Sequence, residues 1–183
     1  MLKKRIIPIL QLSDDELVKS VKFNNHKYVG DPINAVRIFN EKQVDEIALI
    51  DVTKSKKKLE LNYDIIKDIA GECRMPFSYG GGIHSINQVE KLFSIGVEKV
   101  ILNSAILNNY NLINKLSNIY GSQSIMISVD INLNYFSNKK LFNWTKKQNL
   151  NLDVNEHINK CIDSGAGEIL INTVYNEGTL RGF

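Results

Sequence analysis

Six short apolar runs, each closed by a polar residue or a glycine and followed by a helical pattern, organise this chain. The runs cover residues 6–10, 47–50, 77–79, 100–102, 125–129 and 169–171. Continuous rather than alternating apolar runs are typical of strands buried on both faces, as in parallel sheets. Strands that alternate with helices build βαβ units, whose chemistry gathers at the carboxyl ends of the strands. We therefore predict an α/β fold with a parallel sheet.

The residues that close the runs are expected at one edge of that sheet: Gln11, Asp51, Gly80, Asn103, Asp130 and Asn172. Capping residues mark helices in the intervals. Helices are predicted to begin after Asp31, Ser85 and Asp153, and Gly71 is predicted to end a helix over residues 61–70.

Two intervals are longer than a strand-to-helix connection requires, residues 12–30 and residues 131–152. Long connections on the carboxyl face of such a fold commonly carry function. We predict loops for both. The second is expected to hold a small hairpin, with residues 134–136 against 141–144 and the turn at Asn138-Lys139.

Composition favours one globular domain over residues 1–183, with 43% hydrophobic residues, 23% charged residues and a net charge of +3. The sequence has no basic stripe with interleaved aromatic residues, so nothing in it indicates nucleic-acid binding. The amino terminus fails as a signal peptide, and no run approaches the ~20 apolar residues of a membrane span. Cys73 and Cys161 are isolated, so we predict a reduced, cytoplasmic protein without metal or cofactor.

A dense basic run, Lys54-Ser55-Lys56-Lys57-Lys58, follows the second apolar run. Such a run is usually a solvated loop. The functional alternative is a mobile basic loop close to an anionic substrate.

Several motifs together resemble one family, the cyclase subunit (HisF type) of imidazole glycerol phosphate synthase from histidine biosynthesis. They include Phe-Ser-Tyr-Gly-Gly-Gly-Ile and Gly-Ala-Gly-Glu-Ile-Leu, and they lie at residues 4–8, 30–32, 77–83, 103–105, 121–123 and 165–170. The match runs along the whole chain at equivalent spacing.

The resemblance implies a (β/α)8 TIM barrel, a fold of about 250 residues. This chain ends after the sixth predicted strand, so we expect an incomplete barrel, truncated there, with its first and sixth strands as unpaired edges. The implied activity is that of a lyase or cyclase-type subunit in a glutamine amidotransferase complex. Such a subunit takes ammonia from a glutaminase (HisH-like) partner and uses it on a phosphorylated small-molecule substrate.

A phosphate site is predicted where glycines follow the third strand. Gly80-Gly81-Gly82 lets backbone N–H groups approach an anion, and the helix after Ser85 favours phosphate at its N-terminus, although a tight turn would also use the glycines. The neighbouring Asn103 and Ser104 add short donors. In the family, the positions of Asp51, Gly81, Gly82, Asn103 and Ser104 contact substrate.

The amino ends of the strands carry four charges that sum to zero: Arg5, Glu46, Lys99 and Glu168. A salt-bridged barrel floor that only stabilises the fold is one interpretation. In the family the matching residues form the gate through which ammonia enters. Glu98 and Gln123 match positions that face the glutaminase.

The catalytic face departs from the family pattern. The family uses two aspartates as general acid and base; Asp130 matches one, but Gln11 stands at the other. A glutamine has no titratable proton, and general acid–base catalysis contributes about 10²–10⁴-fold. Lys19 matches a lysine that closes over substrate. Tyr175 and Glu177 stand where the family usually has aspartates.

Three functions therefore remain open. The first is a diverged paralogue that conducts ammonia and serves amidation of a bacterial surface sugar beside a ligase-like partner. The second is a cyclase subunit of histidine biosynthesis. The third is a non-catalytic assembly subunit or inert fragment. The altered Gln11 favours the first.

Overall fold

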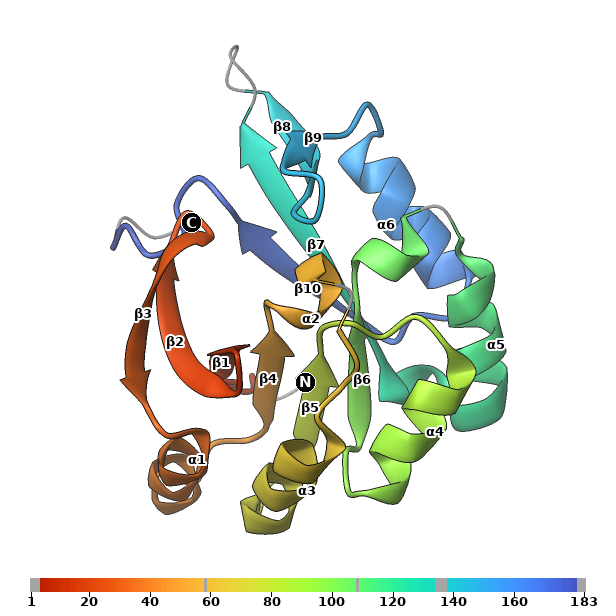
Figure 1. Cartoon of the computed structure of the whole chain (residues 1–183). Coiled ribbons are helices and arrows are strands. Elements are labelled where there is room, and N and C mark those ends of the chain that lie inside the picture. Colours follow the sequence, from red (N-terminus) through yellow and green to blue (C-terminus); the bar gives the residue numbers. More distant parts are fainter. Residues whose placement is uncertain (1–3, 58, 108, 134–137, 181–183) are drawn as a thin grey trace. The chain divides into compact units, whose positions relative to one another are not determined.

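The computed structural model in Figure 1 describes residues 4–57, 59–107, 109–133 and 138–180. The chain forms two compact units. Unit 1 comprises Met1–Val18 and Tyr28–Val100, and unit 2 comprises Lys19–Lys27 and Ile101–Phe183. The prediction of a single domain stays a prediction.

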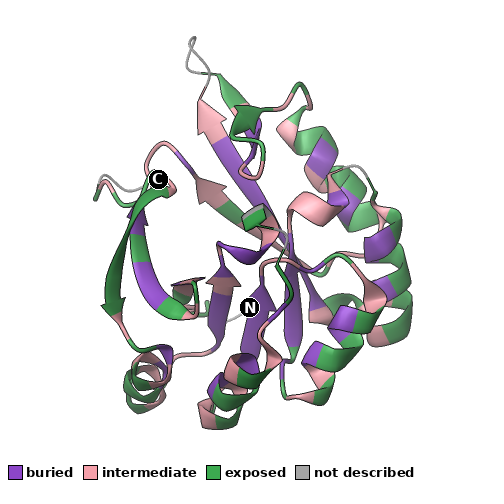
Figure 2. Cartoon of the chain, viewed as in Figure 1, coloured by how far each residue is buried: buried purple, intermediate pink, exposed green. Residues whose placement is uncertain are grey.

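Unit 1 contains three parallel strands, β1 (Ile9–Ser13), β4 (Ile47–Asp51) and β5 (Phe77–Gly80). They pair in sequence order, with Gln11 opposite Ile50 and Ile50 opposite Gly80. Nearly every residue of β4 and β5 is buried, as Figure 2 shows. This two-sided burial explains their continuous apolar runs and confirms the predicted α/β fold with parallel strands.

Helices connect these strands: α1 (Pro32–Glu41), the four-residue α2 (Lys54–Lys57), α3 (Tyr63–Glu72) and α4 (Ile86–Ser94). The predicted caps at Asp31 and Ser85 are confirmed, since each side chain accepts a backbone N–H of its helix. The prediction that Gly71 ends a helix is wrong. The helix α3 continues through it to Glu72, with Asn62 as the N-cap and Cys73 as the C-cap.

Unit 2 is built on β7 (Ile125–Leu133), which pairs in parallel with β10 (Glu168–Thr173) and antiparallel with β8 (Lys139–Asn143). A short β9 (Gln148–Asn149) pairs with β8. The helices are α5 (Asn111–Tyr120) and α6 (Val154–Asp163), with the 3-10 turns η1 (Ser104–Ile106) and η2 (Ser122–Ser124). The strand β6 (Lys99–Leu102) crosses the boundary between the units.

The interval 12–30 is not a loop. It forms β2 (Glu16–Val21), antiparallel to β1, and β3 (Asn24–Gly30), the neighbour of β2. Because β2 pairs with β1, the prediction that the first strand is an unpaired edge is wrong. Both connections are two-residue turns with positive φ, at Asp14-Asp15 and at Lys22-Phe23. This is the backbone of a type I′ hairpin, without the glycine that usually signals it.

Two more boundaries differ from the prediction. The first strand begins at Ile9, so Gln11 lies inside β1 rather than after it, and β7 continues beyond Asp130 to Leu133. A hairpin does follow, but Lys139 belongs to β8 and pairs with Leu133 instead of turning the chain. Residues 134–136, predicted as its first strand, lie outside the described residues.

No helix among the described residues is both long and apolar enough to cross a membrane.

Candidate active site

Asp130 lies near the end of β7, and two carboxamides hold its carboxylate. Asn172 Nδ2 donates to Oδ1 at 2.9 Å, and Asn103 Nδ2 donates to Oδ2 at 2.8 Å. The strand pairing brings them together: Asn172 is the register partner of Asp130 on β10, and Asn103 directly follows β6. Each carboxylate oxygen therefore has a fixed donor.

The electrostatics of this cluster favour a protonated carboxyl more than water does. Asp130 is only 5% exposed, and this burial raises the pKa of its carboxyl. The hydrogen bonds from Asn172, Asn103 and Ser128 act in the opposite direction, because they stabilise the charged form. A buried carboxyl with a raised pKa, held in a fixed orientation, is suited to general acid or base chemistry.

Sequence reasoning placed Asn172 at this edge of the sheet without a role in the site, and it missed Ser128. Ser128 stands two residues before Asp130, on the same face of β7, and Asn172 Nδ2 donates to its Oγ at 3.0 Å. Asn172 closes the last apolar run, so its place at the strand end was a usable signal. Ser128 lies inside an apolar run, and only its register relative to Asp130 could have indicated it.

The other two predicted catalytic residues are on β1 and β2. Gln11 belongs to unit 1 and is half-buried in the middle of β1. Lys19 is exposed on β2, so it stands on a strand rather than on the predicted loop. Ser104, which was predicted to bind phosphate, begins the turn η1 directly after Asn103 and is partly buried.

Asp51 caps the start of α2. Its Oδ1 accepts the backbone N–H groups of Thr53 at 2.9 Å and Lys54 at 3.1 Å, at the start of α2. Burial raises the pKa of Asp51, and these two N–H groups oppose that shift. Gly81 packs directly against it: a Cβ on Gly81, at φ +108°, would lie 2.2 Å from the carbonyl oxygen of Asp51. Only glycine fits there.

Three backbone N–H groups at the predicted anion site already have internal partners. Gly82 N–H donates to Ser55 Oγ at 2.8 Å, and the backbone N–H groups of His84 and Ser85 both donate to Gln88 Oε1. Gln88 and Ser85 form a capping box at the start of α4. An anion at this turn would therefore compete with side-chain oxygens for the same N–H groups.

The basic run after β4 is not a solvated loop over residues 54–57, which form α2. Lys54 is buried, and Lys57 Nζ lies 2.9 Å from Asp14 Oδ1 in the β1–β2 turn. Lys58 lies outside the described residues.

Three of the four predicted gate residues form one cluster in unit 1. The carboxylate of Glu46, 2% exposed, accepts from Arg5 Nη1 at 3.0 Å and from Lys99 Nζ at 3.0 Å, and Ser78 Oγ donates to it as well. A buried carboxylate with this set of donors is electrostatically compensated. Glu168 belongs to unit 2, where it starts β10 opposite Met126.

The two residues predicted to face a partner are both exposed. Glu98 directly precedes β6, and its backbone N–H donates to the carbonyl of Phe77 at 2.9 Å. Gln123 lies in η2, and its Nε2 donates to the carbonyl of Tyr120 at 3.1 Å. Their side chains are therefore available at the surface.

Comparison with known proteins shows which family this chain matches. The family described as "Histidine biosynthesis protein" matches residues 5–183. The chain is 43% identical over 183 residues to a Pseudomonas aeruginosa protein provisionally named imidazole glycerol phosphate synthase subunit hisF2, covering 100% of this chain and 73% of that protein.

Two further relatives extend the comparison. A Vibrio vulnificus protein, provisionally named subunit hisF3 of the same synthase, is 44% identical over 186 residues, with 100% of this chain and 71% of that protein covered. The imidazole glycerol phosphate synthase subunit HisF of Petrotoga mobilis is 33% identical over 184 residues, with 100% and 73% covered. Numbered or provisionally named subunits thus share more residues with this chain than that HisF does.

Proposed function

The chain belongs to the HisF-type cyclase family of histidine biosynthesis proteins, and on that premise we propose that it is an ammonia-using barrel subunit with altered chemistry. In this proposal the parallel strands belong to a (β/α)8 barrel, ammonia comes from a glutaminase partner, and the substrate is a phosphorylated small molecule. The observation that carries it is Asp130, buried and held by two carboxamides, in a chain with Gln11 at the position of the second acid.

A single positioned carboxyl can serve as one general acid or base. Asp130 would move a proton at one side of the substrate, from the position that Asn103 and Asn172 fix. Gln11 can donate or accept a hydrogen bond but cannot exchange a proton. A reaction that needs a single general acid or base, such as the attack of ammonia on an activated carbon, suits this pair.

The Glu46 cluster supports the ammonia part of the proposal. Arg5 and Lys99 both donate to the buried carboxylate of Glu46. A small displacement of either cation would leave the other as the partner of this carboxylate. We propose these three residues as gate residues, and Glu168, in unit 2, as a fourth on the family pattern alone. The exposed Glu98 and Gln123 would contact the glutaminase.

Two reactions fit this description. Amidation of a bacterial surface sugar beside a ligase-like partner is favoured by the replaced acid at Gln11 and by the higher identity to the provisionally named subunits. The cyclase reaction of histidine biosynthesis is the alternative, and the retained Asp130 favours it.

Co-expression with a glutaminase subunit tests the ammonia role without knowledge of the substrate. We expect co-purification and a stimulated glutamine hydrolysis, both weakened by Glu98→Lys, because the substitution reverses a charge in the proposed interface. Glu90→Lys, at an exposed position within α4, is the matched control. Failure to bind any glutaminase would overturn the ammonia role and favour a non-catalytic subunit.

A further inference from the structure

The basic run that follows β4 has no part in the function proposed above. Two of its lysines are paired with the turn between β1 and β2. Lys57 Nζ lies 2.9 Å and 3.2 Å from the two carboxylate oxygens of Asp14, and Lys54 Nζ lies 3.7 Å from Asp15 Oδ1. All four residues belong to unit 1. Each aspartate of the turn therefore has a lysine of α2 as an ionic partner.

The backbone of this turn is unfavourable without such partners. Asp14 has φ +51° and Asp15 has φ +68°, and two consecutive left-handed residues other than glycine are uncommon. Two carboxylates on adjacent residues also repel each other. The ammonium groups of Lys54 and Lys57 compensate both negative charges, so they stabilise the turn in this conformation.

Hydrogen bonds without a cationic donor join the same two segments. The backbone N–H of Asp14 donates to Thr53 Oγ1 at 3.2 Å, and Asn62 Nδ2 donates to Asp15 Oδ2 at 2.7 Å. Thr53 Oγ1 in turn donates to Ser13 Oγ at 3.0 Å. The segment that contains α2 therefore contacts both the backbone and the side chains of the turn.

The two ion pairs differ in their exposure to solvent. The side chains of Lys57 and Asp14 are both more than half exposed, so dissolved ions screen their attraction. The side chain of Lys54 is only 10% exposed, and Asp15 Oδ1 is buried and accepts no hydrogen bond among the described residues. Burial protects this second pair from screening. Added salt should therefore release Lys57 from Asp14 before it affects Lys54.

We propose that these two aspartates and two lysines form an electrostatic latch, which holds the start of β2 against α2 and opens in part when salt screens the exposed pair. The strand β2 begins at Glu16, directly after the turn, and Glu16 is the register partner of Ser13. Release of the turn would therefore free the first residues of β2. The same strand carries Lys19, one of the predicted catalytic residues, so the latch would restrict the motion of that lysine.

Amide hydrogen exchange of residues 13–18, with β5 as the internal reference, measures opening of the latch without substrate or partner. Relative to β5, we expect exchange to accelerate about two- to fivefold between about 0.05 M and about 0.5 M sodium chloride, the effect of losing one exposed ion pair. Exchange that does not respond to salt overturns the proposal, as does an equal acceleration in β5, which would indicate unfolding of the whole unit.

Screening is distinguished from anion binding with inorganic phosphate as the probe. Phosphate at about 5 mM, added at constant ionic strength, should leave the exchange of residues 13–18 unchanged, because screening depends on ionic strength. Faster exchange in phosphate would make Lys57 an anion site instead of a latch residue, and would overturn the proposal.

The variant Lys57→Met should accelerate exchange of residues 13–18 about two- to fivefold in low salt and remove the salt dependence, because the screened pair is absent. Lys57→Arg keeps the charge and should behave as the unmodified chain. Lys160→Met is the matched control, since it breaks a similarly exposed pair with Glu156, and it should leave residues 13–18 unchanged. Equal effects of Lys57→Met and Lys160→Met, or a full salt dependence in Lys57→Met, overturn the proposal.

Discussion

Glu177 holds Phe23 in a backbone conformation that large side chains rarely adopt. Phe23 has φ +58°, and its N–H donates to Glu177 Oε2 at 2.9 Å. Ser20 Oγ donates to Oε1 at 2.8 Å, and the carbonyl of Glu177 accepts the N–H of Lys22 at 3.0 Å. A left-handed residue other than glycine costs about 1–2 kcal/mol. The hydrogen bonds to Glu177 offset that cost and stabilise the hairpin turn.

Removing this carboxylate should loosen the turn selectively. In Glu177→Ala, two hydrogen bonds to a charged group disappear, each worth about 1.5–3 kcal/mol. We expect amide hydrogen exchange in residues 19–27 to accelerate at least tenfold, with little change in β7. Glu156→Ala removes an exposed pair with Lys160 and is the control. Unchanged exchange at residues 19–27 would show that the turn does not depend on Glu177.

The Glu46 cluster predicts a large stability loss. Glu46→Gln leaves the buried ammonium of Lys99 without its counter-charge, which typically costs about 3–5 kcal/mol. Urea unfolding measures this loss. Adding Lys99→Met should recover much of it, because the uncompensated charge is removed as well. A control, Glu72→Gln, breaks an ion pair with the exposed Arg37 and should cost less than 1 kcal/mol. Equal losses for Glu46 and Glu72 would contradict the burial argument.

The pH dependence of stability should report on Asp130. Burial raises its folded-state pKa above the unfolded value of about 4, so the folded state binds more protons between the two values. The contribution of this group is complete below pH ~4 and is lost as pH rises through the raised pKa. The unfolding free energy of Asp130→Asn, relative to the unmodified chain, should therefore increase with pH. Asp163→Asn, on an exposed position, should show no such trend. A difference that falls with pH would contradict the assignment.

Two glycines offer a matched test of the close approach between β5 and Asp51. In Gly81→Ala the new Cβ would meet the Asp51 carbonyl, so we expect a loss of several kcal/mol or failure to fold. Gly71→Ala adds a Cβ into open space inside α3 and should stabilise by about 0.5–1 kcal/mol. Thermal melting compares them. A well-folded Gly81→Ala protein would refute the steric argument.

The parts of this fold that the sequence predicts are those dictated by burial. The strands β4, β5 and β6 are buried on both faces and read as continuous apolar runs, and the caps of α1 and α4 carry their usual residues. The hairpin of β2 and β3 was missed because β3 is almost entirely exposed, so burial imposes no pattern on it. Its turns, Asp14-Asp15 and Lys22-Phe23, also lack glycine.

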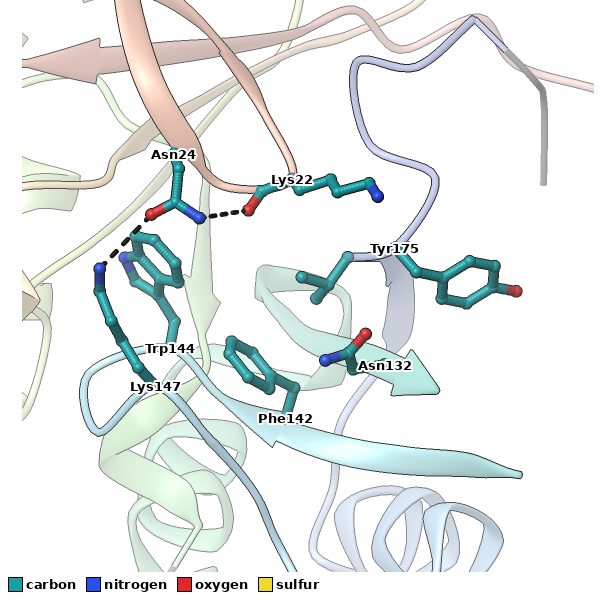
Figure 3. Close-up of a pocket in the computed structure, with 8 residues that line it drawn as sticks. Lys22, Asn24, Asn132, Phe142, Trp144, Lys147 and Tyr175 are labelled. Atoms are coloured by element: carbon teal, nitrogen blue, oxygen red, sulfur yellow. Dashed lines mark hydrogen bonds between the residues drawn. The ribbon is translucent and has the colours of Figure 1, made fainter. Parts of the chain in front are cut away.

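The candidate site divides in a similar way. Asp130 and Asn103 follow apolar runs, and the structure joins them as neighbours. Asp51 and Gly82 were expected to contact substrate. In the structure, Asp51 caps α2 and the N–H of Gly82 donates to Ser55. Both contacts depend on α2, a helical turn that the basic run did not indicate. A pocket lined by Lys22, Phe142 and Val174, among others, is built from three segments that are distant in the sequence (Figure 3). No local sequence pattern indicates that these segments meet.

The central claim is that Gln11 has changed the chemistry of an ammonia-using subunit, and one kinetic measurement tests it directly. Turnover of the bisphosphate substrate of histidine biosynthesis is followed with saturating ammonia, for the unmodified chain and for Gln11→Asp. We predict turnover at least 10²-fold below that of a HisF with both aspartates, and a gain in Gln11→Asp, because general acid–base catalysis contributes about 10²–10⁴-fold. Turnover by the unmodified chain at the rate of such a HisF would contradict it.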